Sequence, residues 1–104
     1  MSNGSESVEA RLIGNRIREL EGLSFGEVAA LSAADGSEVL VAGRTCSLTT
    51  FVQQIGAGQL LATVQLSRSV AAGLMQIVQE RGLVFLINGS VREATPDELM
   101  NSGG

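Results

Sequence analysis

Apolar and polar residues between positions 59 and 91 change their spacing twice, which predicts three consecutive elements. Leu60 to Leu66 alternate between a more apolar and a more polar side, as in a strand with two unlike faces. Apolar residues from Val70 to Val78 then share one helical stripe, with Ser69 as a suitable cap and Gly82 as a suitable stop. The five apolar residues Leu83 to Ile87 predict a central strand covered on both faces.

Two further helices are predicted near the ends of the chain. Apolar residues recur at helical spacing through residues 8–21, and polar residues including Arg16 fall on the side predicted to face solvent. Thr95 and Glu98 have the spacing of a capping box, and Pro96 suits the first helical position. We therefore expect an amphipathic helix first and a short helix last.

The middle of the chain predicts a hairpin followed by a short helix. Phe25–Ala33 and Glu38–Gly43 have strand-like composition, and Asp35-Gly36 between them is a typical hairpin turn. Apolar residues within residues 45–55 then recur at i, i+3, i+4 and i+7, which predicts a helix.

These elements predict one α+β domain over residues 8–100, with a disordered tail at 1–7 and a flexible tail at 101–104. In chain order they are helix, two strands, helix, strand, helix, strand and helix. A helix between two strands of one sheet makes those strands parallel. We therefore expect an open four-stranded mixed sheet with helices mainly on one face.

The composition adds an expectation about partners. The chain has 104 residues, 44% of them hydrophobic, and a mean hydropathy of +0.25. A domain of this size has a large surface relative to its volume, so the apolar surplus predicts an interface with a second copy or another protein. The alternative explanation of the apolar surplus is a core built of small residues, because alanine and glycine are abundant.

The set of side chains restricts the chemistry. There is no histidine, tyrosine, tryptophan or lysine and a single cysteine, which excludes histidine triads, lysine Schiff bases and His/Cys zinc sites. A net charge of −4 argues against nucleic acid as a partner. We therefore expect a protein without catalytic activity, metal or cofactor. A minimal enzyme using Cys46, or carboxylates such as Glu27 and Glu38, is the alternative.

Location and source are predicted from composition alone. The chain opens with no signal-peptide pattern and has no apolar run near the roughly 20 residues that cross a bilayer. A single cysteine cannot form an internal disulfide. These features predict a cytoplasmic protein that does not bind membranes, and arginine without lysine predicts a GC-rich bacterial or phage source.

Polar residues follow each strand that we expect to be parallel, and these strand ends would lie at one edge of the sheet. Two predicted helices begin there, and helix N-termini attract anions. One hypothesis is that these polar residues bind a small anionic ligand, such as a phosphate or nucleotide. The other is that the hydroxyls only cap helices and that the arginines are simply exposed at the surface. The residues concerned are Arg44, Thr45, Ser47, Ser67, Arg68, Ser69, Asn88 and Arg92.

Three single residues carry separate expectations. Cys46 lies two residues after Arg44 and would come just before a helix N-terminus, and both features favour a reactive thiolate. The alternative is that Cys46 is an inert core residue, as free cysteines often are. Gly14 and Gly73 would lie inside helices, where glycine costs about 1 kcal/mol relative to alanine. A close neighbour is therefore expected at each glycine.

Taken together, the sequence favours a small non-catalytic protein–protein interaction domain, such as an adaptor, inhibitor or assembly subunit, that forms a homo-oligomer. A module that binds a small anionic ligand is the alternative.

Overall fold

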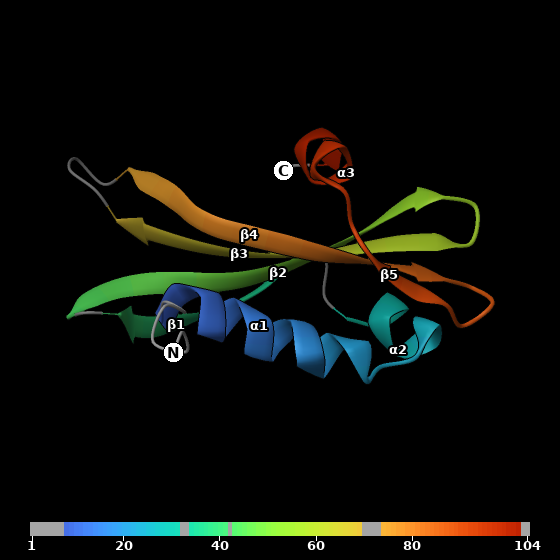
Figure 1. The fold of residues 1–104 in the computed structure, drawn as a ribbon, viewed down its shortest axis with the longest axis horizontal. Coiled ribbons are helices and arrows are strands. Elements are labelled where there is room, and N and C mark those ends of the chain that lie inside the picture. Colours follow the sequence, from blue (N-terminus) through green and yellow to red (C-terminus); the bar gives the residue numbers. More distant parts are fainter. Residues whose placement is uncertain (1–7, 32–33, 42, 70–73, 103–104) are drawn as a thin grey trace, which may run out of the picture.

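The computed structural model describes residues 8–31, 34–41, 43–69 and 74–102, which form five strands and three helices (Figure 1). The helices are α1 (Val8–Glu21), α2 (Phe25–Ala29) and α3 (Pro96–Ser102). The strands are β1 (Ala34–Val41), β2 (Arg44–Gly56), β3 (Gln59–Ser69), β4 (Met75–Leu86) and β5 (Val91–Glu93). Neither the predicted tail at 1–7 nor residues 103–104 are among the described residues, and α3 includes residues 101 and 102.

The strands form a single antiparallel sheet in the order β1-β2-β3-β4-β5. Each strand pairs with its neighbour in the chain, so the sheet is a simple meander. Gly43 and Gly58 lie in the turns before β2 and β3 and have φ angles of 79° and 68°, which glycine adopts without steric cost.

One face of the sheet packs against α1 and α2. Successive side chains of a strand point to opposite faces, and the even-numbered apolar residues of β3 share one core with the buried side of α1. That core contains Ile13, Ile17 and Leu20 from α1, Val28 from α2, and Val41, Cys46, Leu60, Ala62, Val64, Leu66, Leu83 and Phe85 from the sheet.

The opposite face carries a smaller core beneath α3. Leu61 and Val84 are fully buried there with Ala94, and Leu99 of α3 packs against them. Gly82 makes this packing possible, because a Cβ at Gly82 would lie only 2.8 Å from Leu99 Cδ2. Helices therefore lie on both faces of the sheet.

The predicted open four-stranded mixed sheet with helices mainly on one face is wrong. The described sheet has five strands, all antiparallel, and helices on both faces. The helix at residues 8–21 agrees with α1, and the strands predicted within 60–66 and 83–87 lie in β3 and β4, apart from Ile87.

The helix predicted over residues 45–55 is instead part of β2. Leu48 and Val52 pack against the core beneath α1, whereas Ile55 packs against the core beneath α3. Both faces of this strand bear apolar residues, and together they imitate helical spacing. The threonines, valine and isoleucine of the segment favour an extended chain.

The helix predicted from Ser69 to Arg81 is also wrong where the structure describes it. Ser69 is the last residue of β3, and β4 begins at Met75; residues 70–73, including Gly73, lie outside the described part. Gly82 is a residue within β4 and not a helix stop. Gly14 does lie in a helix, but among the described residues no atom beyond the local helix backbone is within 4 Å of a Cβ built there, so the expected close neighbour is absent from that part of the chain.

The strand predicted at Phe25–Ala33 is wrong where the structure describes it, because residues 25–29 form α2; residues 32 and 33 lie outside the described part. Ser24 caps this helix with a complete capping box, in which its hydroxyl accepts from Glu27 N and its own N–H donates to the Glu27 carboxylate. The hairpin turn expected at Asp35-Gly36 is therefore wrong, because both residues lie in β1.

Candidate functional site

The eight residues expected to bind an anion lie in two groups at opposite ends of the sheet. Arg44, Thr45 and Ser47 begin β2 and lie near Ser67, Arg68 and Ser69, which end β3, since Ser47 pairs with Ser67. Asn88 lies in the turn between β4 and β5, and Arg92 is in β5. Figure 1 shows the β4–β5 turn at the far end of the sheet from the end of β3. The structure therefore does not bring the eight residues together.

The first group is itself divided between the two faces of the sheet. Residues directly opposite one another in antiparallel strands share a face. Arg68 lies opposite Cys46, which is in the core beneath α1, whereas Ser47 and Ser67 lie on the other face. No described helix begins at Ser47 or Ser69, so neither has the helix N-terminus that the hypothesis required.

Cys46 is buried in the core beneath α1, with 4% of its surface exposed. The side chain is enclosed among apolar residues, so its environment is that of a small core residue. Neighbouring Arg68 is partly exposed, and its Nε is buried without a hydrogen-bond partner in the structure.

Arg92 and Asn88 take part in local contacts at the other end of the sheet. Arg92 donates to both carboxylate oxygens of Glu98 at 2.9 and 2.7 Å. The hydrogen bonds from Arg92 and from the Thr95 backbone lower the pKa of Glu98 from its ordinary value of 4.5 to about 2. Asn88 Oδ1 accepts from Ser90 N at 2.9 Å and shapes the turn. Both side chains therefore have structural partners.

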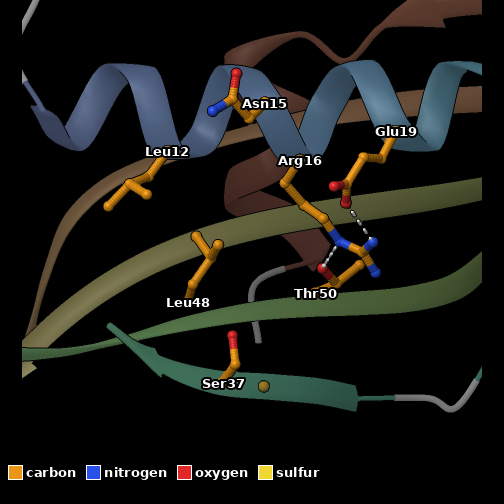
Figure 2. A pocket seen from close by; sticks show the side chains of 8 residues that line it. Leu12, Asn15, Arg16, Glu19, Ser37, Leu48 and Thr50 are labelled. Atoms are coloured by element: carbon orange, nitrogen blue, oxygen red, sulfur yellow. Dashed lines mark hydrogen bonds and ion pairs between the residues drawn. The ribbon is translucent and has the colours of Figure 1, made fainter. Parts of the chain in front are cut away.

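A groove of about 340 Å³ lies between α1 and the strands β1 and β2 (Figure 2). Figure 2 shows Arg16 reaching from α1 to Thr50 with Glu19 beside it. Arg16 Nε donates to Thr50 Oγ1 at 3.0 Å, and Arg16 NH1 lies 3.0 Å from the Glu19 carboxylate. The sequence prediction that Arg16 faces solvent missed this contact, because the partner strand was not assigned.

Two other grooves have different linings. One, of about 490 Å³, lies between the residues around Ser24 and the β4–β5 turn. The other, of about 580 Å³, lies between α3 and β4, and its lining includes the ion pair between Arg81 Nε and Glu93 at 3.0 Å. Hydrogen bonding to Arg81 lowers the pKa of Glu93. Each of these three grooves therefore lies at a junction between elements.

The sheet face opposite α1 is only partly covered, and the part beyond α3 we call the open face. Its members follow from the pairing of neighbouring strands, and Gln65 Nε2 donates across it to Glu80 Oε2 at 3.3 Å. Small polar side chains occupy its centre, and the described members include two carboxylates and no arginine. These members are Glu38, Leu40, Thr45, Ser47, Thr49, Gln65, Ser67, Ile77 and Glu80.

Two large apolar residues of the open face are exposed. Leu40 of β1 is 74% exposed and Ile77 of β4 is 51% exposed. They lie on different strands, with the hydroxyls of β2 and β3 between them. Ile87, 72% exposed, lies at the other end of the sheet, beside the β4–β5 turn.

No group of three or more His, Cys, Asp or Glu side chains in the described part of the chain is placed to hold a metal ion. None of the described helices combines the length and apolar character needed to cross a bilayer.

No protein-family model matches this chain, and comparisons with curated proteins and with solved structures also gave no match.

Proposed function

We propose that this chain is a non-catalytic protein–protein interaction domain that self-associates through its open face. The observation that supports this proposal is the exposure of Leu40 and Ile77 on the part of the sheet that α3 leaves uncovered. Large apolar side chains on a broad uncovered sheet face favour contact with another protein.

The proposed lack of catalysis rests on the side chains available. The chain has no histidine or lysine to act as a base or nucleophile, and burial keeps the Cys46 thiol from solvent. The anionic-ligand hypothesis has no single site to support it, because its residues are divided between two ends of the sheet. A cytoplasmic location also remains a proposal, supported by the single free cysteine.

Sedimentation velocity on the wild type and on the variant Leu40→Ser/Ile77→Ser tests the proposal. We expect the average mass of the sedimenting wild-type species to rise as the protein concentration increases from about 10 µM to about 1 mM. The variant should associate at least tenfold more weakly, since each exposed side chain contributes on the order of 1 kcal/mol or more at an interface.

Ile87→Ser is the matched control, because Ile87 is about as exposed as Leu40 and more exposed than Ile77 but lies at the far end of the sheet. It should leave association unchanged. A wild type that remains monomeric over the whole concentration range would contradict the proposal.

A further inference from the structure

We infer that self-association is head-to-tail: the outer side of α1 in one copy lies on the open face of the next copy. This inference rests on the proposed function and specifies the two surfaces involved. These two surfaces carry opposite charges and lie on opposite sides of one molecule.

The outer side of α1 bears a stripe of exposed residues, Val8, Arg11, Asn15 and Arg18, which we call the α1 stripe. Their spacing of three and four residues places them on one side of the helix. The stripe lies opposite the buried residues of α1. Arg18 donates to Asn15 Oδ1, and nearby Glu19 is paired with Arg16. The stripe is therefore basic although the whole chain has a net charge of −4.

The open face has the complementary character. Its charged members are the carboxylates of Glu38 and Glu80, and Leu40 and Ile77 add exposed apolar surface. The α1 stripe offers a matching apolar residue, Val8, which is 48% exposed. Opposite charges at the rim of an apolar contact set the orientation and the choice of partner.

The helix α1 is long enough to cross the open face. A helix of 14 residues such as α1 is about 21 Å long, and Arg11 and Arg18 are separated by about 10 Å along it. The three strand spacings from β1 to β4 add to about 14 Å, so a helix can cross all four strands. Between the carboxylates, small hydroxyl side chains such as Ser47 and Ser67 allow the helix to approach the sheet closely.

One molecule cannot form this contact with itself. The buried side of α1 packs on the sheet face opposite the open face, so the stripe and the open face point away from each other. Two open faces packed together would bring Glu38 and Glu80 of each copy near those of the other. A head-to-tail contact avoids this repulsion and leaves one stripe and one open face free, so it continues into a ring or a filament.

Charge reversal tests the inference with two variants, Arg11→Glu/Arg18→Glu and Glu38→Arg/Glu80→Arg. Each variant alone carries two surfaces of the same sign, and we expect its self-association to weaken at least tenfold. An equimolar mixture restores opposite charges at both surfaces, so mixed complexes should form. Sedimentation velocity from about 10 µM to about 1 mM measures both effects.

Two controls separate association from folding. Asp97→Arg makes the same charge change as Glu38→Arg at an exposed position on α3, outside both surfaces, and should associate like the wild type. Circular dichroism should show each variant folded, which matters for Glu80 because it accepts a hydrogen bond from Gln65.

The outcomes distinguish this inference from the proposed function. If folded Arg11→Glu/Arg18→Glu associates like the wild type while Leu40→Ser/Ile77→Ser does not, the head-to-tail arrangement is wrong and the proposed function stands. A mixture of the two folded variants that stays monomeric also overturns the arrangement. A wild type that is monomeric throughout overturns both.

Discussion

Gly82 determines where α3 can pack. It lies in β4, and its missing side chain leaves space that Leu99 and Ala94 occupy. Ala94 N donates to Gly82 O at 2.8 Å, which fixes the chain just before α3. This one glycine therefore combines a backbone hydrogen bond with a side-chain contact from another element.

Gly82→Ala should lower the free energy of unfolding by about 1–3 kcal/mol, as expected for overpacking. The added Cβ would meet Leu99 Cδ2 at 2.8 Å, which can move, and Ala62 O at 3.1 Å, which belongs to the central strand and cannot move easily. Urea unfolding measures the change.

Gly14→Ala is the matched control, because in the part of the chain that the structure describes no atom beyond the local helix backbone lies within 4 Å of its new Cβ. It should raise the free energy of unfolding by about 0.5–1 kcal/mol through helix propensity. If Gly82→Ala were as stable as the wild type, the packing of α3 described above would be wrong.

At this scale the sequence was a poor guide to individual residues. Gly82 was interpreted as a helix stop because glycine often ends helices, yet its role comes from Leu99, seventeen positions later in the chain. Arg16 was assigned to solvent because its partner Thr50 is far away in sequence. Of the two hypotheses for Cys46, the structure agrees with the inert core residue.

Among the elements, α3 is the clearest case of a local prediction that the structure confirms. Thr95 N donates to Glu98 Oε1 at 2.9 Å, and Glu98 N donates to Thr95 Oγ1 at 3.2 Å, which is the predicted capping box. Arg92 adds the ion pair that ties the first turn of α3 to β5. Glu98 therefore links the cap of α3 to the sheet.

We expect α3 to loosen from the sheet in acid. The pKa of Glu98 is lowered from 4.5 to about 2 in the folded chain. The stabilisation that its carboxylate gives to the packing of α3 is therefore complete above about pH 4.5 and is lost as the pH falls toward 2. NMR resonances of Leu99 and Gly82, recorded between pH 7 and pH 2, should report the change.

Glu98→Gln should weaken the packing of α3 at neutral pH and remove most of this pH dependence, because the amide cannot carry the charge. Glu21→Gln, an exposed position on α1, should leave the transition in place. A wild type in which these resonances do not change down to pH 2 would argue against the role of Glu98.

Prediction of helices and strands succeeded where one pattern was unambiguous. α1 buries only one side, so its apolar residues keep helical spacing. β2 buries residues on both faces, and its pattern of apolar residues fits either a helix or a strand. Pairing with strands on both sides decides between them, and that pairing is a tertiary effect.

For the whole molecule, these errors changed the topology. Two helices wrongly placed between consecutive strands implied parallel connections, whereas tight turns such as that at Gly58 give an antiparallel meander. The expected ligand site depended on parallel strand ends and was lost with them. The α+β character was predictable because it needs only some helices and some strands.

Salt should weaken assembly more than folding. At about 0.5 M salt the Debye length falls to roughly 4 Å, which screens exposed Arg–Glu contacts between copies, while the apolar core is not screened. We expect the association constant to fall several-fold between about 0.05 and about 0.5 M sodium chloride, with little change in the thermal midpoint.

Sedimentation and thermal unfolding in the same buffers measure these two quantities. An association that strengthens with salt would indicate that apolar contact alone holds the copies together.

The position of α1 before the sheet has a consequence for synthesis. A ribosome makes α1 before the strands, but the residues of β3 and β4 on which it packs come roughly 40 to 70 positions later. A helix of this length is only marginally stable alone in water. Hairpins between neighbouring strands need no distant residue, whereas the core that covers Ile13, Ile17 and Leu20 is complete only after β4 has left the ribosome. We therefore expect α1 to dock after the central hairpins, with its apolar side available to chaperones until then.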